Sequence, residues 1–240
     1  MSKLFVFTVL TVLATGWSGE SFTPRSGETR VSAGTASRVA IVFGQVAVSA
    51  SPDRPPPSLS PYARRRYRPP QEPGVAGGTE DAVVYLEPVD GTPQTSVGDP
   101  VRIIQHDRTI VPHVSVAQVA SAVQFPNDDD VFHNIFSLSS GNRFSLGRYG
   151  PGVTKTHRFE NTGVVRLFCD IHAEMAGVIL VLDTPYATRI GRDGSYRLTG
   201  IPAAAYRAIA WHPDAGADTT VVDLRDGEER RVDFQLRSSR

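Results

Sequence analysis

Residues 163–183 read GVVRLFCDIHAEMAGVILVLD, two apolar runs joined by one short polar loop. Both runs are rich in β-branched residues, which favours strands. The loop carries Cys169, His172 and Met175 with two residues between each pair. A connection this short brings a thiolate, an imidazole and a thioether into one neighbourhood. The stretch therefore predicts two strands joined by a loop that can bind a metal ion.

The strand pattern of this stretch continues through most of the chain. Short alternating or apolar runs are separated by turn signals such as Asn-Thr-Gly at 161–163 and Asp-Gly at 193–194 and 226–227. Further strand candidates are 38–49, 82–88, 101–105, 113–118, 121–127, 131–137, 157–160, 194–200, 206–211, 219–224 and 231–236. Helical periodicity is missing from the sequence, so we predict an all-β fold of sandwich architecture.

Composition excludes several classes of protein. The chain has 240 residues, 40% of them hydrophobic, which suffices for one or two domains with real cores. Its 25 basic and 25 acidic residues balance, which argues against binding nucleic acid through bulk positive charge. The single cysteine excludes an internal disulfide, a four-Cys zinc site and a Cys-ligated iron–sulfur cluster.

The N-terminus has the layout of a secretory signal. A basic start at Lys3 precedes a mostly apolar run at 4–17, which is shorter than the ~20 residues that span a bilayer. We predict a signal peptide at 1–18, a disordered segment at 19–37, no stable membrane span, and a periplasmic or secreted protein. A buried N-terminal strand and an uncleaved anchor are the alternatives.

A Pro/Arg-rich excursion at 51–80 interrupts the N-terminal strands of 38–99. Eight of the 18 prolines fall within 51–73, which excludes a helix or an interior strand there. The cluster at Arg64–Arg68 either keeps a solvated linker soluble or docks on an anionic surface.

A second histidine completes a familiar ligand set. Thiolate and thioether suit copper(I), imidazole suits both copper oxidation states, and two His, one Cys and a weak Met form the blue-copper arrangement. His133, which lies 36 residues before Cys169 and follows the polar turn 127–130, is the candidate for the missing ligand.

Residues 100–183 resemble a cupredoxin, a blue-copper domain of the plastocyanin and amicyanin type. The matching features are Phe-Pro-Asn at 125–127, His-Asn at 133–134, and the Phe-Cys pair that ends at Cys169, followed by His172 and Met175. The resemblance implies a Greek-key β-sandwich that holds one type 1 copper ion. It implies His133, Cys169 and His172 as equatorial ligands, Met175 as the axial ligand, and Asn134 as the residue that hydrogen-bonds across to the Cys loop.

Other interpretations of these residues stay open. Cys169 and Met175 are also what a buried core contains, and zinc is chemically possible, although structural zinc sites prefer two or more Cys. A Cys nucleophile with His172 or His133 as base is a further option. His106 and His113 form a conceivable weaker metal site, with ordinary surface or core positions as the alternative.

Residues 184–237 resemble the second half of a carboxypeptidase-regulatory-like, or transthyretin-like, β-sandwich. The match rests on Asp-Gly at 193–194, Tyr196, Leu198 and the aromatic positions Tyr206 and Trp211. We hypothesise that the strand at 38–49 completes this second small sandwich, with the cupredoxin-like domain inserted in it or fused edge-on to it.

The sequence therefore leads to one function and two alternatives. We expect a non-enzymatic blue-copper protein that transfers single electrons to or from a redox protein that docks near His172. A copper-binding or carrier module without electron transfer, and a structural module of the cell envelope, are the alternatives. The first requires the sulfur of Cys169 and the ring nitrogens of His133 and His172 to lie within reach of one metal ion.

Overall fold

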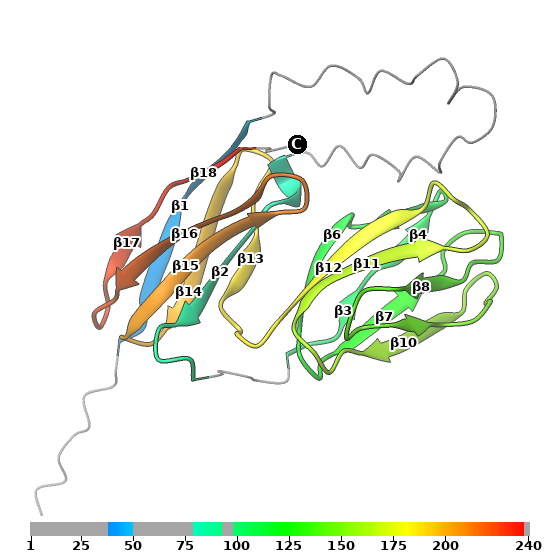
Figure 1. Cartoon of the computed structure of the whole chain (residues 1–240), viewed down its shortest axis with the longest axis horizontal. Helices are drawn as coiled ribbons and strands as arrows, with labels where there is room; N and C mark the ends of the chain where they lie inside the picture. The colour runs from blue at the N-terminus through cyan, green and yellow to red at the C-terminus, as the bar shows by residue number, and fades with distance from the viewer. Residues whose placement is uncertain (1–37, 50–78, 93–97, 238–240) are drawn as a thin grey trace, which may run out of the picture. The chain divides into compact units, whose positions relative to one another are not determined.

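The computed structural model describes residues 38–49, 79–92 and 98–237, and in these ranges the protein consists of β-strands and one short 3₁₀ helix (Figure 1). The elements are β1 (Ala40–Ser49), η1 (Thr79–Asp81), β2 (Val83–Pro88), β3 (Val101–Arg102), β4 (Ile104–His106), β5 (Thr109–Val111), β6 (Val114–Gln118), β7 (Ala122–Pro126), β8 (Ile135–Ser137), β9 (Phe144–Ser145), β10 (Thr154–Arg158), β11 (Gly163–Cys169), β12 (Ala176–Leu182), β13 (Ala187–Arg189), β14 (Ser195–Ile201), β15 (Ala205–His212), β16 (Gly216–Asp223), β17 (Glu229–Arg231) and β18 (Phe234–Arg237). The predicted all-β fold class is confirmed. No helix in the described ranges is long and apolar enough to cross a membrane.

Strands β3 to β12 form one sandwich, which we call the metal-site sandwich (residues 101–182). One sheet has the order β10-β7-β3 and the other β6-β12-β11-β8-β9, with the hairpin β4–β5 beside them (Figure 1). Alternate residues of the two sheets point into one apolar core, as the period of two in a strand requires. This core includes Phe125, Ile135, Leu167 and Ile179, each at most 1% exposed.

The remaining strands form a second sandwich, which we call the flanking sandwich (described residues 40–49, 79–88 and 187–237). Its sheets are β14-β1-β17, with β18 also paired to β1, and β13-β2-β15-β16. Strand β1 pairs antiparallel with β14, from Ala40 opposite Ile201 to Gln45 opposite Ser195. This is the pairing that the insertion hypothesis requires, and the domain boundaries themselves stay a prediction.

Gly44 shows why β1 can occupy the middle of its sheet. A Cβ atom at this position would lie 1.8 Å from the carbonyl oxygen of Val232, so the backbone of the segment between β17 and β18 approaches β1 where a side chain is lacking. The amide of Val232 donates a hydrogen bond to the carbonyl of Phe43 at 2.9 Å. Glycine is therefore required at this close approach of two backbones.

One predicted strand is much shorter than the sequence pattern suggests. The strand expected at 131–137 begins only at Ile135, because the Asn127 side chain donates to the Val131 carbonyl at 2.8 Å and closes a turn there. Further on, the strand expected at 157–160 is β10, which ends at Arg158. The predicted signal peptide, the segment at 19–37, and the Arg64–Arg68 cluster lie outside the described residues.

Candidate metal centre

The loop that carries three of the predicted ligands is closed by its own backbone. Strands β11 and β12 pair up to Phe168 opposite Ala176, which leaves a short connection between them. Within it the amide of Cys169 donates to the carbonyl of Met175 at 3.3 Å, and the amide of Met175 donates to the carbonyl of His172 at 3.1 Å. These bonds fold the connection tightly enough to bring the three side chains into one region.

Strand register brings the distant histidine to this loop. Strand β8 pairs antiparallel with β11, and Cys169 lies opposite Ile135. His133 precedes Ile135 by two residues and is fixed by a backbone bridge to Tyr149, with hydrogen bonds of 3.1 and 2.9 Å in the two directions. The ring of His133 therefore lies next to the Cys169 sulfur.

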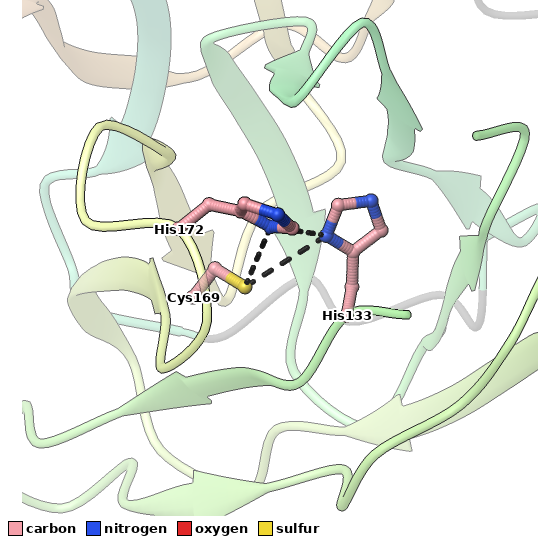
Figure 2. A group of neighbouring side chains, drawn as sticks. All are labelled: His133, Cys169 and His172. Atoms are coloured by element: carbon pink, nitrogen blue, oxygen red, sulfur yellow. Dashed lines mark hydrogen bonds between the residues drawn. The ribbon is translucent and has the colours of Figure 1, made fainter. Parts of the chain in front are cut away.

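Three donor atoms converge at this point (Figure 2). The Cys169 Sγ lies 3.8 Å from the Nδ1 of His133 and 3.9 Å from the Nδ1 of His172, and the two Nδ1 atoms are 3.2 Å apart. Ligands about 2.0 to 2.3 Å from one metal ion can be no more than about 4.3 Å apart, so all three separations fit a shared ion. The geometric requirement set by the sequence is met.

Burial separates the site into a protected side and an accessible side. His133 and Met175 are fully buried, Cys169 is 5% exposed, and His172 is half-buried. Met175 belongs to the same apolar cluster as Cys169. A thiolate and two imidazoles, with a buried thioether beside them, suit copper better than a structural zinc ion, which prefers two or more Cys.

Asp129 is part of this centre, although the sequence pattern gave it no role beyond the polar turn. Its Oδ2 lies 2.8 Å from the Nε2 of His133, and the two side chains are 9% and 0% exposed. Burial works to raise the pKa of Asp129, but hydrogen bonds from the Arg108 amide, the His133 ring and the Asp107 amide outweigh it, and the pKa lies below its usual value. The only sequence signal was an Asp four residues before a candidate ligand.

Asn134 joins the two loops of the site. Its side-chain amide donates to the Asp170 carboxylate at 3.0 Å, and the backbone amide of Asp170 donates to the Asn134 carbonyl at 3.3 Å. Its side-chain oxygen accepts a hydrogen bond from the Ser145 hydroxyl at 3.1 Å. Asn134 therefore contacts the residue directly after Cys169, which is the position expected of a residue that holds the Cys loop.

A buried tyrosine also borders the site. The Tyr149 hydroxyl donates to the side-chain oxygen of Gln105, and both residues are at most 3% exposed. Burial, and secondarily the nearby Cys169, raise the pKa of the Tyr149 phenol above its usual range. The phenol therefore stays neutral and adds a polar but uncharged neighbour to the site.

The other histidines lie apart from the centre. His113 bonds to Asp81 through Nδ1 at 2.7 Å, and His106 is exposed next to Asp107. His157 stacks on Phe144, and the Nδ1 of His212 accepts hydrogen bonds from backbone amides. Within the described residues, the one group of three or more His, Cys, Asp or Glu side chains that could hold a metal ion is His133, Cys169 and His172, and neither His106 nor His113 belongs to it.

Comparisons with known proteins give partial matches. No protein-family model and no curated protein matches the sequence. A novel purple cupredoxin from Nitrosopumilus maritimus is 26% identical over 34% of this chain and 98% of that one, with a TM-score of 0.31. Amicyanin from Paracoccus versutus is 14% identical over 40% of this chain and 97% of that one, with a TM-score of 0.32.

The copper-containing nitrite reductase of Thermus scotoductus is a third partial match. It is 23% identical over 40% of this chain, with a TM-score of 0.33, and the matched region spans about a quarter (26%) of that protein. With TM-scores of this size these likenesses carry no functional weight. The function proposed below rests on the side-chain geometry.

Proposed function

We propose that the protein binds one copper ion through His133, Cys169 and His172, with Met175 as a weak axial ligand, and transfers single electrons as a periplasmic or secreted protein. The observation that carries the proposal is the convergence of one thiolate and two imidazoles within 3.2 to 3.9 Å of one another. Copper, when bound, supplies a one-electron couple.

The chain's own contribution is a rigid and mostly dry ligand set. Cys169 lies at the end of β11 and is paired with β8, and His133 is held by its bridge to Tyr149. Because strand pairing fixes the backbone on either side of the site, the ligands keep nearly the same positions in both oxidation states. Little reorganisation then opposes the gain or loss of an electron.

The half-buried ring of His172 is the proposed entry point for electrons. Ile171, directly before it, is 38% exposed, and Phe132, directly before His133, is 59% exposed. Exposed apolar side chains mark an interaction site where they form a contiguous patch, and we propose that these two do so around His172. A redox protein partner that docks over His172 therefore meets apolar surface next to the ligand, and the proposal needs no substrate and no catalytic residue.

Loading with copper(II) tests the proposal. The wild-type protein is expected to turn intensely blue, to bleach on one-electron reduction and to recover its colour on oxidation. Cys169→Ser removes the thiolate and should abolish the colour, whereas His157→Phe, a substitution outside the site, should preserve it.

Two other outcomes would contradict electron transfer. A colourless protein that still binds copper(I) tightly would favour the carrier alternative. A folded protein that binds neither oxidation state would leave the structural alternative.

A further inference from the structure

The Nε2 atom of His133 has a charged partner. Its neighbour at 2.8 Å is the Oδ2 of Asp129, and the His133 ring is fully buried. An ionised carboxylate can only accept hydrogen bonds, so the proton of a neutral His133 ring belongs on Nε2. Nδ1, which faces Cys169 and His172, then carries no proton, so its lone pair can bind a metal ion.

Asp129 is itself held in place by a tight hairpin turn. The backbone amide of Arg108 donates to the same Oδ2 at 3.1 Å, and the Asp129 amide donates to the side-chain oxygen of Asn127 at 3.0 Å. Asp107 and Arg108 have φ values of 50° and 54°, a conformation that costs residues other than Gly about 1 kcal/mol or more. This strained backbone conformation points the amide of Arg108 at the carboxylate of Asp129.

Burial distinguishes Asp129 from Asp128 and Asp130, which carry the same charge in the same turn. Asp128 and Asp130 are exposed, whereas the Asp129 side chain is 9% exposed. Water and salt screen an exposed charge, but a buried charge acts on its neighbours at a lower effective dielectric. Of the three carboxylates, only that of Asp129 is both shielded and bonded to a candidate ligand.

We propose that Asp129 is a positioning residue of the copper centre: its carboxylate fixes His133 as an Nδ1 ligand, and its negative charge favours copper(II) over copper(I). This inference rests on the proposed function. A carboxylate hydrogen-bonded to a ligating histidine fixes the ring and raises its basicity. The more basic ligand stabilises the more highly charged ion, so Asp129 lowers the reduction potential of the site.

Asp129→Asn isolates the charge from the shape. The amide has almost the same size and keeps an oxygen that can accept from both His133 Nε2 and the Arg108 amide. The matched control is Asp130→Asn, which removes the same charge from an exposed neighbour without a bond to His133. Electrochemical midpoints are measured on the copper-loaded full chain of each variant.

The expected result is an increase of the copper(I)-to-copper(II) ratio in Asp129→Asn of about tenfold at a given applied potential, which is a rise of about 59 mV in the midpoint. Asp130→Asn should shift the midpoint far less. Equal shifts in the two variants, or no shift in Asp129→Asn, would overturn the role of the charge.

A metal-free measurement tests the positioning separately. In the copper-free wild-type protein, ¹⁵N shifts of the His133 ring above pH 8 should report the tautomer with the proton on Nε2. Asp129→Leu removes the acceptor and should populate the other tautomer. A ring that keeps its Nε2 proton in Asp129→Leu would refute control by Asp129.

The two measurements separate this inference from the proposed function. If the wild-type protein binds no copper, the proposed function fails, while the tautomer of His133 still decides whether Asp129 orients the ring. If copper binds and cycles but neither Asp129 variant differs from its reference, the proposed function stands and this inference fails.

Discussion

Met175 serves two purposes in one position, because it is a fully buried core residue and the candidate axial ligand. Met175→Ala should lower the free energy of unfolding of the copper-free protein by about 2–5 kcal/mol, since it leaves a cavity in the core. Met175→Leu keeps the volume and should cost less than about 1.5 kcal/mol. Urea denaturation of the two copper-free variants measures both values.

The two Met175 variants also distinguish the contribution of Met175 to core packing from its contribution as a copper ligand. Met175→Leu removes the thioether but preserves the core, so a change in the visible spectrum of its copper-loaded form is expected to come from the lost sulfur. If Met175→Leu proved as unstable as Met175→Ala, the site would depend on the shape of methionine rather than on its volume.

For single residues, the sequence predicts contacts between side chains that are close together along the chain. It does not predict contacts that depend on how distant segments fold against each other. Cys169 and His172 share one short loop, so their proximity follows from spacing alone. Asp129 follows from no such rule, because the turn contains three consecutive Asp residues and only the middle one is directed at His133. Which of the three turns inward depends on the left-handed hairpin turn at 107–108, which the sequence pattern does not reveal.

The segment from Asn127 to Asn134 is the element that delivers His133. Asn127 is fully buried, and its side chain makes three hydrogen bonds, donating to the carbonyls of Val131 and Tyr149 and accepting from the Asp129 amide. Each contributes about 0.5–1.5 kcal/mol net, so Asn127→Ala should lower the free energy of unfolding by about 1.5–4.5 kcal/mol. It should also weaken copper(II) binding, measured by competition with a chelator, because Asp129 and His133 lose a common support.

Asn142→Ala is the matched control for this element. Asn142 is 6% exposed and its side chain donates to the carbonyl of Asn161 at 3.0 Å, so it also supports a turn of the metal-site sandwich. Its substitution should cost stability without changing copper affinity. Equal losses of copper affinity in both variants would show that general loosening, and not the 127–134 segment, controls the site.

The segment from Asn127 to Asn134 also shows why the sequence pattern did not predict where the strand β8 begins. The apolar pattern at 131–137 reads as one strand, but a buried side-chain amide captures the Val131 carbonyl and delays the strand to Ile135. Periodicity describes which faces are apolar, whereas side-chain hydrogen bonds to the backbone decide where pairing begins. The two halves of the flanking sandwich were predictable as strands, but their pairing depends on contacts such as that between Gly44 and Val232, which are remote in sequence.

At the scale of the whole molecule, several carboxyl groups have pKa values below their ordinary values. The pKa of Asp193 is lowered by hydrogen bonds from Ser195, that of Asp233 by the amide of Gln45 and then by Arg231. The Arg225 amide, followed by Arg230, lowers the pKa of Glu228. The folded state thus holds fewer protons on these groups than the unfolded state does at the same acidic pH.

His157 also makes the folded state less stable on acidification, but it does so closer to neutral pH. His157 stacks on Phe144 with ring centroids 4.4 Å apart and meets Phe159 edge-on. Burial in this aromatic group lowers the pKa of His157 below its ordinary value of 6.5. Its contribution to stability is therefore fully present above pH 6.5 and is lost as the pH falls through the lower folded value.

The copper-free protein should accordingly lose stability in two steps on acidification. The first step starts below about pH 6.5 and belongs to His157. The second starts below about pH 4.5, where these carboxyl groups begin to bind protons in the unfolded state but still resist protonation in the folded state. Urea midpoints measured between pH 3 and pH 8 report both steps.

Two variants separate the steps. His157→Phe keeps an aromatic ring against Phe144 and should remove only the first step, while Asp233→Asn should reduce only the second. A midpoint that rises as the pH falls from 8 to 5 would contradict the sign of the His157 shift, because only a group with a raised folded pKa stabilises the protein in that direction.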